Sequence, residues 1–228
     1  YQSIKENVNI LLTSKEKFNH IKNMIFTQII PALDSCPPIV IERVCFSISI
    51  LIVIGTVTYW QEGIEDIMQF ASASTTNCYY SVIILSNFAN ELEDLALSQK
   101  MNYMIKDVLM DKNTEIFKFI NFILTNANNV NDKAMFNKLY IKAIELAKNW
   151  ITFEMNVLSN PQLIKMLIDN INSDNIESIC DLFTAVLPYA KSAKLEASAT
   201  DGLDELIAKT DKDEMTSVSY IIEVIIKY

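Results

Sequence analysis

The sequence predicts an all-α protein built as a right-handed α-α superhelix of HEAT or armadillo-like repeats. Half of the 228 residues are hydrophobic, which excludes a disordered chain. Only three residues are glycine and five are proline, which is too few turn residues for an all-β fold with many tight hairpins. Apolar residues recur at helical spacing along the chain, and no long segment shows the alternation of a strand. Because a pair of amphipathic helices cannot bury its apolar face alone, we expect neighbouring pairs to stack.

The first third of the chain predicts four helices. They are expected at roughly 4–12, 15–33, 38–54 and 64–71. Thr13 and Ser14 interrupt the first apolar stripe and can cap the second helix. The Cys-Pro-Pro sequence at 36–38 ends the second helix and begins the third, and GTVTYWQEG turns the chain before the fourth.

Further apolar stripes predict helices after a loop and cap cluster at 71–77. These stripes cover residues 85–92, 101–109, 116–124, 139–150, 163–171, 176–187, 193–209 and 213–227. The second and third of them are compatible with one long helix or with two. Asn160-Pro161 is a strong start signal, and Asp174 and Glu177 have the spacing of a capping box.

The spacing of these helices predicts a repeat. Successive outer helices begin near residues 38, 77, 132 and 174, close to the period of about 40–47 residues of HEAT and armadillo units, with one insertion. The chain opens at Tyr1 and ends within the apolar segment IIEVIIKY. We therefore expect residues 1–228 to be a single HEAT-repeat segment, a fragment of a longer solenoid.

The segment from Cys36 to Trp60 allows a second interpretation. Residues 44–60 carry no charge and reach the lower limit of a membrane span. Serine and threonine dilute this stretch, and no cluster of Lys or Arg flanks it. A helix that is apolar on all sides is also what the middle of a helical stack requires, and we favour this buried position. An integral membrane protein anchored through 44–60 is the alternative.

Charge and cysteine content exclude several classes of function. The net charge of −9 argues against a direct nucleic-acid partner and suits a basic protein partner or simple solubility. Four cysteines are far apart and lack paired spacing, so we expect reduced thiols and neither a disulfide framework nor a zinc site. We expect no metal and no cofactor.

The sequence also gives little support to catalysis. His20 is the only histidine, and it has no partner residue near it in the sequence. Nucleotide-binding, nucleophile-elbow and zinc-protease motifs are absent from the sequence. We therefore expect no enzyme activity and no catalytic residues.

Residues 36–70, CPPIVIERVCFSISILIVIGTVTYWQEGIEDIMQF, resemble the importin-β (karyopherin-β) superfamily, in particular its transportin-3 and importin-13 branch. In that branch a helix with an apolar-Cys pattern precedes a connector with Trp and a second helix. The matching positions here are Ile41, Val44, Cys45, Ile48, Leu51, Ile52, Trp60, Ile64, Ile67, Met68 and Phe70. SVIILSNFANELEDLAL and KAIELAKNWITFEM are also similar to this branch, although a family proline is missing from the first and Asn149 replaces a serine before Trp150.

The resemblance implies a nuclear transport receptor that moves protein cargo between cytoplasm and nucleus under the control of Ran-GTP. Its implied partners are cargo, which in several relatives is basic, Ran-GTP through the full-length protein, and nucleoporins, without nucleic acid or membrane. Acidic residues of inner helices bind such cargo in the family. By position, the implied cargo-binding residues here are Glu62, Glu65, Asp66, Glu91, Glu93 and Asp94. Solvated helix ends are the alternative explanation for these carboxylates.

A HEAT-repeat scaffold of another assembly, such as a phosphatase or coat complex, would show the same sequence pattern. The fold would be identical, so only the identity of the partner distinguishes the two functions.

Overall fold

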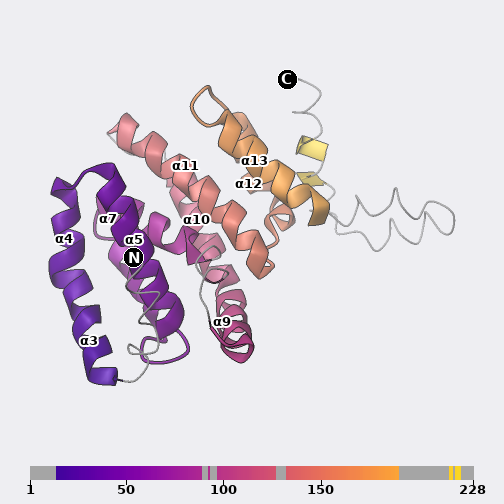
Figure 1. Cartoon of the computed structure of the whole chain (residues 1–228). Helices are drawn as coiled ribbons and strands as arrows, with labels where there is room; N and C mark the ends of the chain where they lie inside the picture. The colour runs from indigo at the N-terminus through magenta and orange to yellow at the C-terminus, as the bar shows by residue number, and fades with distance from the viewer. Residues whose placement is uncertain are drawn as a thin grey trace. The chain divides into compact units, whose positions relative to one another are not determined.

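The computed structural model describes residues 14–88, 92, 97–126, 132–189, 216–217 and 219–221. All regular secondary structure in these residues is helical, as predicted (Figure 1). The chain divides into two compact units, Tyr1–Ile116 and Phe117–Tyr228. The helices expected at 4–12, 193–209 and 213–227 lie mainly outside the described residues.

The first unit begins with a continuous helical rod that confirms the helix predicted at 15–33. It consists of α3 (Lys15–Met24), a π-helical turn (Ile25–Ile29), α4 (Ile30–Ala32) and a 3-10 turn (Leu33–Ser35). Ser14 caps α3 by accepting a hydrogen bond from the Lys17 amide. The π-helical turn ends at Ile29, two residues before Pro31, which has no N–H to donate to the preceding turn.

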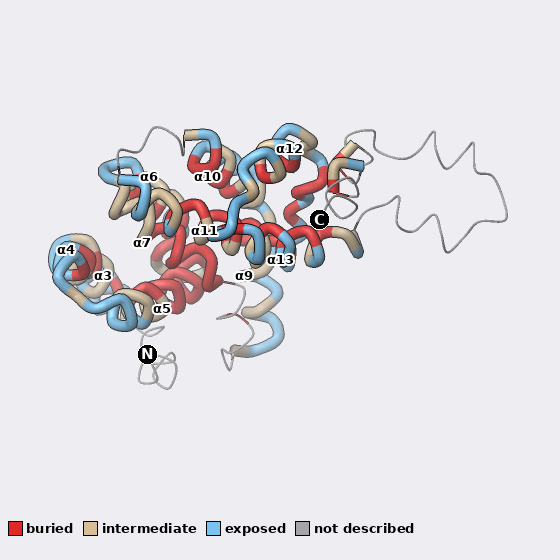
Figure 2. Tube along the Cα trace, turned by 90° about the horizontal axis from the view of Figure 1, so that it is seen from above, coloured by how far each residue is buried: buried red, intermediate tan, exposed pale blue. Residues whose placement is uncertain are grey.

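Helix α5 (Pro38–Gly55) is the apolar helix around which the first unit packs. Every residue from Ile48 to Gly55 is buried, and α5 contacts α7 (Thr75–Ser86) and α6 (Gly63–Ala71). Figure 2 shows the same helix as a long buried segment. It is the one helix in the described part of the chain that is long and apolar enough to cross a membrane. Half of that window is buried inside the protein, which fits the core position that we favour.

Ser49 connects α5 to α7. Its hydroxyl lies 2.6 Å from the Ile84 carbonyl oxygen of α7 and 2.9 Å from the Cys45 carbonyl oxygen of its own helix. At the far end of α5, a Cβ added to Gly55 would lie 2.8 Å from the Cβ of Trp60, so only glycine allows the chain to turn this closely. The predicted turn between α5 and α6 is therefore confirmed.

The structure places two features of the first unit that the sequence outlined. Helix α7 begins at Thr75, capped by Ser74, within the loop and cap cluster predicted at 71–77, and so includes about ten residues before the apolar stripe at 85–92. Its predicted end near Asn90 lies outside the described residues. The stripes at 101–109 and 116–124 form two helices, α9 (Gln99–Asp111) and α10 (Asn113–Asn126), and α10 crosses from the first unit into the second.

The second unit contains α11 (Lys133–Trp150), α12 (Pro161–Asp169) and α13 (Ile176–Val186), with 3-10 turns at Ile151–Phe153, Val157–Ser159 and Leu187–Tyr189. Helices α11 and α13 pack side by side, as Figures 1 and 2 both show. Asn137, near the start of α11, bonds to Asp174, just before α13. Lys148, near the end of α11, pairs with Asp181, further along α13. The two helices therefore run in the same direction. This is the relation between equivalent helices of neighbouring helical pairs.

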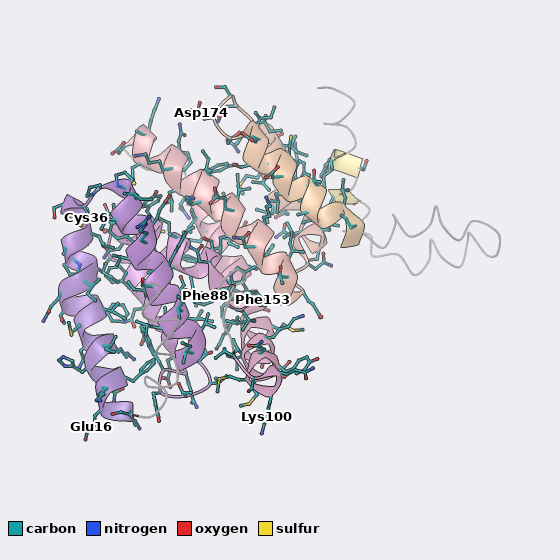
Figure 3. The ribbon with its side chains drawn as sticks, viewed as in Figure 1. Glu16, Cys36, Phe88, Lys100, Phe153 and Asp174 are labelled. Atoms are coloured by element: carbon teal, nitrogen blue, oxygen red, sulfur yellow. The ribbon has the colours of Figure 1, made fainter. Side chains whose placement is uncertain are left out.

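Of the two helix start signals predicted in the second unit, the one at Asn160 is confirmed and the one at Asp174 is wrong. Asn160 caps α12 by accepting from the Leu163 amide at 3.0 Å, with Pro161 in the first turn, as expected. The capping box of Asp174 and Glu177 is wrong: α13 begins one residue later, with Asn175 at the cap position. Asp174 lies in the loop before α13 (Figure 3) and accepts instead from the side chain of Asn137. The Asp174 side chain therefore bonds to α11 instead of capping α13.

The helix starts predicted for the repeats can be compared with the structure. Helices α5, α7, α11 and α13 begin at Pro38, Thr75, Lys133 and Ile176, each within two residues of the predicted starts at 38, 77, 132 and 174. The division of the chain into repeats at these positions stays a prediction.

Candidate functional site

The predicted acidic cluster of Glu62, Glu65 and Asp66 lies at the beginning of α6. Glu62 occupies the N-cap position, and Glu65 and Asp66 lie in the first turn. Negative charge is stabilising there because it faces the positive end of the helix dipole. The position of all three carboxylates therefore has a local structural reason as well as a possible role in binding.

Asp66 is held by two contacts. Its Oδ2 accepts a hydrogen bond from the indole Nε1 of Trp60 at 2.7 Å and lies 2.6 Å from the Nζ of Lys22 on α3. The Lys22 ammonium also lies 5.1 Å from the centre of the Trp60 ring, within range of a cation–π contact. Asp66 thus joins α3, the turn and α6, and its charge is balanced inside the protein.

A shallow groove opens beside Asp66. It has a volume of about 350 Å³ and is lined by Lys22, Phe26, Asp66, Gln69 and Phe70. The rings of Phe26 and Phe70 pack with their centres 5.8 Å apart, and Phe26 also meets Trp60 edge-on at 5.9 Å. The groove combines an aromatic floor with one cation and one carboxylate, which suits a protein segment of mixed character.

Glu65 is paired as well. Its Oε1 accepts from the Nζ of Lys112, which follows α9, and this hydrogen bond raises the pKa of Lys112. The other oxygen, Oε2, is shielded from solvent and has no hydrogen-bond partner in the part of the chain that the structure describes. A ligand that used Glu65 would have to compete with Lys112.

Glu62 is the exposed member of the cluster. Its carboxylate has no ion pair or side-chain hydrogen bond with any residue in the described ranges. The structure therefore brings the three predicted residues together but leaves only Glu62 unneutralised. Glu91, Glu93 and Asp94 lie outside the described residues.

The structure also shows where the single histidine and the four cysteines lie. His20 is exposed on α3. Among the residues that the structure describes, no group of three or more His, Cys, Asp or Glu side chains could hold a metal ion. Cys36, Cys45, Cys78 and Cys180 are free thiols, and burial raises the pKa of Cys45 to about 12 and that of Cys78 to about 11. Such thiols are protonated at neutral pH and react slowly.

Sequence reasoning missed a second acidic surface, between α11 and α13. A groove of about 400 Å³ is lined there by Glu145, Lys148, Asn149, Glu177, Ser178 and Asp181. Lys148 pairs with Asp181 at 2.8 Å and Lys142 with Glu145 at 2.7 Å. Of the three carboxylates in the groove, Glu177 is the one that forms no ion pair with a described residue. The residues are about 30 positions apart in the sequence, so no local pattern could have revealed the groove.

Comparison with known families gave one match. Residues 37–182 match the family described as Exportin 1-like protein, which is more than half of the chain and extends from the start of α5 into α13. The regular secondary structure described within the matched region is all helical and the family is of the HEAT type, in agreement with the predicted fold class. No curated protein and no solved structure matched the chain.

Proposed function

This chain belongs to the exportin 1-like protein family, and from that membership we propose that it acts in nucleocytoplasmic transport by binding protein cargo on its helical surface. The match over residues 37–182 is the observation that carries the proposal. Members of this family are transport receptors and not enzymes, so we propose no catalytic activity for the chain.

Two finer points are part of the proposal. Control by Ran-GTP, contact with nucleoporins and shuttling between cytoplasm and nucleus follow from the family and are proposed here through the intact protein. Placement in the transportin-3 and importin-13 branch rests on the resemblance of residues 36–70.

The first turn of α6 supports a contact with basic cargo. Glu62 is exposed and carries an unpaired charge, and the groove beside Asp66 supplies the aromatic side chains of Phe26 and Phe70. A basic segment would gain electrostatic attraction at Glu62 and apolar contact in the groove. Glu65 and Asp66 would contribute less, because Lys112 and Lys22 already neutralise them. Glu91, Glu93 and Asp94 are proposed as further cargo contacts from their position in the sequence alone.

The test is a capture experiment with the tagged protein expressed in its own cells. Bound proteins are identified after incubation with Ran loaded with GTP or with GDP. We expect Ran to bind in its GTP form only and the set of captured cargo proteins to change between the two nucleotides. Capture of the same proteins in both states, with no Ran bound, would contradict the proposal and favour a scaffold in another assembly.

A matched pair of charge reversals tests the surface itself. Glu62→Lys should reduce the captured basic cargo about tenfold, because an attractive contact becomes repulsive. Asp107→Lys on α9 is the control, since Asp107 is an exposed carboxylate that does not line the groove. Equal capture by the two variants would remove Glu62 from the proposed contact surface but leave the transport function itself untouched.

A further inference from the structure

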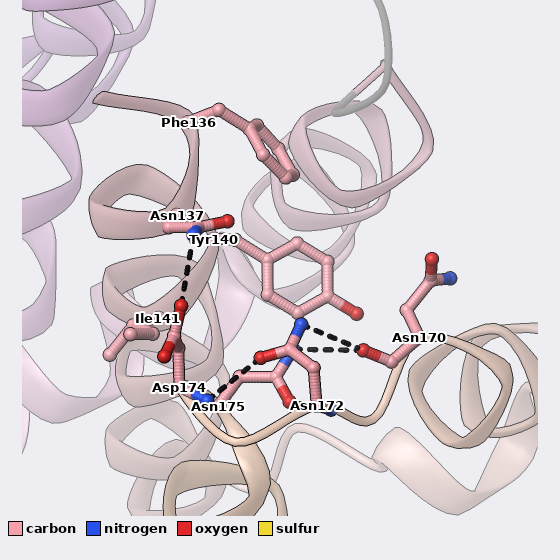
Figure 4. Close-up of a pocket in the computed structure, with 8 residues that line it drawn as sticks. All are labelled: Phe136, Asn137, Tyr140, Ile141, Asn170, Asn172, Asp174 and Asn175. Atoms are coloured by element: carbon pink, nitrogen blue, oxygen red, sulfur yellow. Dashed lines mark hydrogen bonds between the residues drawn. The ribbon is translucent and has the colours of Figure 1, made fainter. Parts of the chain in front are cut away.

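A small polar pocket lies between α11 and the loop that joins α12 to α13. Phe136, Asn137 and Tyr140 of α11 line one side, and Asn170, Asn172 and Asp174 of the loop line the other (Figure 4). The volume is about 130 Å³. One ordered water needs only about 10–15 Å³, so a single trapped water does not fill this space. The pocket has room for the end of a long side chain.

Tyr140 lines this pocket, and its buried hydroxyl has no partner among the described residues. The residue is only 4% exposed, and no described residue forms a hydrogen bond with its Oη. Figure 4 shows the phenol pointing towards the loop at Asn170 and Asn172. Burial raises the pKa of Tyr140 to about 12, so the group stays a neutral hydroxyl at physiological pH. A buried polar group without a partner carries an unrecovered desolvation cost, which a ligand can remove.

The side-chain amides around the pocket each use one of their two N–H groups within the protein. Asn137 donates to Asp174 Oδ2 at 3.2 Å, Asn170 donates to the Met166 carbonyl at 2.8 Å, and Asn175 donates to the Asn170 carbonyl at 2.9 Å. Each of these partners is an oxygen, which fixes the orientation of each side-chain amide. The side-chain amide of Asn172 also faces the Asn170 carbonyl, at 3.4 Å.

Several acceptor oxygens remain available. No residue in the described ranges donates to the side-chain oxygens of Asn137 and Asn170, and the Tyr140 Oη can accept. Asp174 adds a negative charge, and no lysine or arginine lines the pocket. A ligand that donates several hydrogen bonds and carries a positive charge complements these oxygens and this carboxylate.

We propose that this pocket binds the guanidinium group of an arginine side chain from a partner protein. Guanidinium has five N–H donors in a planar fork, which matches several separate acceptors better than the single point of an ammonium group. Phe136 and Tyr140, whose ring centres are 5.7 Å apart, provide aromatic surface for the cation. Glu177, in the first turn of α13, adds a further negative charge in the groove between α11 and α13.

The inference rests on the contacts of the pocket and does not require the transport function. A pocket that binds arginine is compatible with either result of the Ran experiment, so failure of one proposal is distinguishable from failure of the other. The site also lies on elements other than α6, and it makes its own set of contacts.

The experiment is an NMR titration of the isotope-labelled 228-residue chain with three short peptides. The probes are N-acetyl-Gly-Ser-Xaa-Ser-Gly-amide with arginine, lysine or citrulline at Xaa. Citrulline has the shape of arginine but no charge. We expect saturable binding of the arginine peptide in the millimolar range, weaker binding of the lysine peptide, and binding of the citrulline peptide at least about tenfold weaker. The shifted resonances should be those of α11 and of residues 170–175.

Three variants assign the binding to the pocket. Asp174→Asn should weaken binding of the arginine peptide about tenfold, and Tyr140→Phe should weaken it several-fold without destabilising the protein. Asp107→Asn, which removes a charge from α9, should leave the affinity unchanged. The proposal is overturned by absence of saturable binding, by equal affinity for the citrulline peptide, by tighter binding of lysine, or by unchanged affinity in both pocket variants.

Discussion

The indole of Trp60 and the carboxylate of Asp66 form a 2.7 Å hydrogen bond across the start of α6. Trp60 is fully buried, and Lys22 reaches the same carboxylate from α3. One acidic side chain that the sequence marks as a binding residue therefore also satisfies a buried donor and joins three elements. Binding and stability compete for this group.

Removal of the Asp66 carboxylate should destabilise the protein. Asp66→Ala leaves the Trp60 N–H without its acceptor, and we expect a loss of about 1–3 kcal/mol in the free energy of unfolding. Asp66→Asn keeps an acceptor and loses only a partly exposed ion pair, which is worth about 0–1 kcal/mol. Urea unfolding measures both. A loss in Asp66→Ala no larger than that in Asp107→Ala would contradict a structural role for this bond.

Two serines on α5 provide a matched pair for the contact between α5 and α7. Ser49→Ala removes the hydroxyl that bonds to Ile84 of α7, and we expect a cost of about 0.5–1.5 kcal/mol. Ser47 bonds only to the Arg43 carbonyl in its own helix, so Ser47→Ala should change stability by less than about 0.5 kcal/mol. Equal unfolding midpoints in urea for the two variants would show that the inter-helix bond contributes nothing measurable.

Two tyrosines with equal burial should respond in opposite ways to loss of the hydroxyl. Tyr80 and Tyr140 are both 4% exposed, but Tyr80 donates to Asp34 Oδ1 at 2.9 Å whereas Tyr140 has no hydrogen-bond partner among the described residues. Tyr80→Phe should cost about 1–2 kcal/mol, since it removes a hydrogen bond to a charged acceptor. Tyr140→Phe should be neutral or stabilising, because it removes an unsatisfied buried group.

Differential scanning calorimetry compares the two tyrosine variants directly. Destabilisation by Tyr140→Phe of the same size as that by Tyr80→Phe would mean that Tyr140 has an internal partner in solution. That result would also weaken the case for the arginine pocket.

Alkaline pH should destabilise the protein through its buried thiols. Burial raises the pKa of Cys45 from 9.0 to about 12, so in the folded state the thiol keeps its proton where the unfolded chain has lost it. The unfolded state then binds fewer protons, and stability falls as pH rises above about 9, at up to about 1.4 kcal/mol per pH unit for one such thiol. The loss is complete only once the pH passes the folded-state pKa.

Urea unfolding between pH 8.5 and 10 checks this slope. The Cys45→Ala variant should lose stability less steeply with pH than the natural chain, although its stability at pH 7 is lower because of the cavity. Cys180→Ala, which removes an exposed thiol, is the control. A slope that Cys45→Ala leaves unchanged would exclude Cys45 as the source.

Local patterns predicted most of the helices because each helix carries its own signals. Ser14 and Asn160 cap the helices that they were expected to cap, and the apolar stretch from Ile48 to Gly55 is buried as its composition required. The boundaries that failed were decided by contacts between helices. Asp174 has the spacing of a local cap, yet it bonds to Asn137, 37 residues earlier in the chain.

The same distinction applies to function. The sequence by itself determined that the chain is all-helical, acidic and without a recognisable catalytic motif, because these properties follow from composition and short-range periodicity. Only the tertiary structure decided which carboxylates are available, since the neutralising lysines Lys22 and Lys112 lie more than 40 residues from Asp66 and Glu65 in the sequence. It alone also revealed the pocket at Tyr140, because a hydroxyl lacks a partner only with respect to neighbours that folding brings around it.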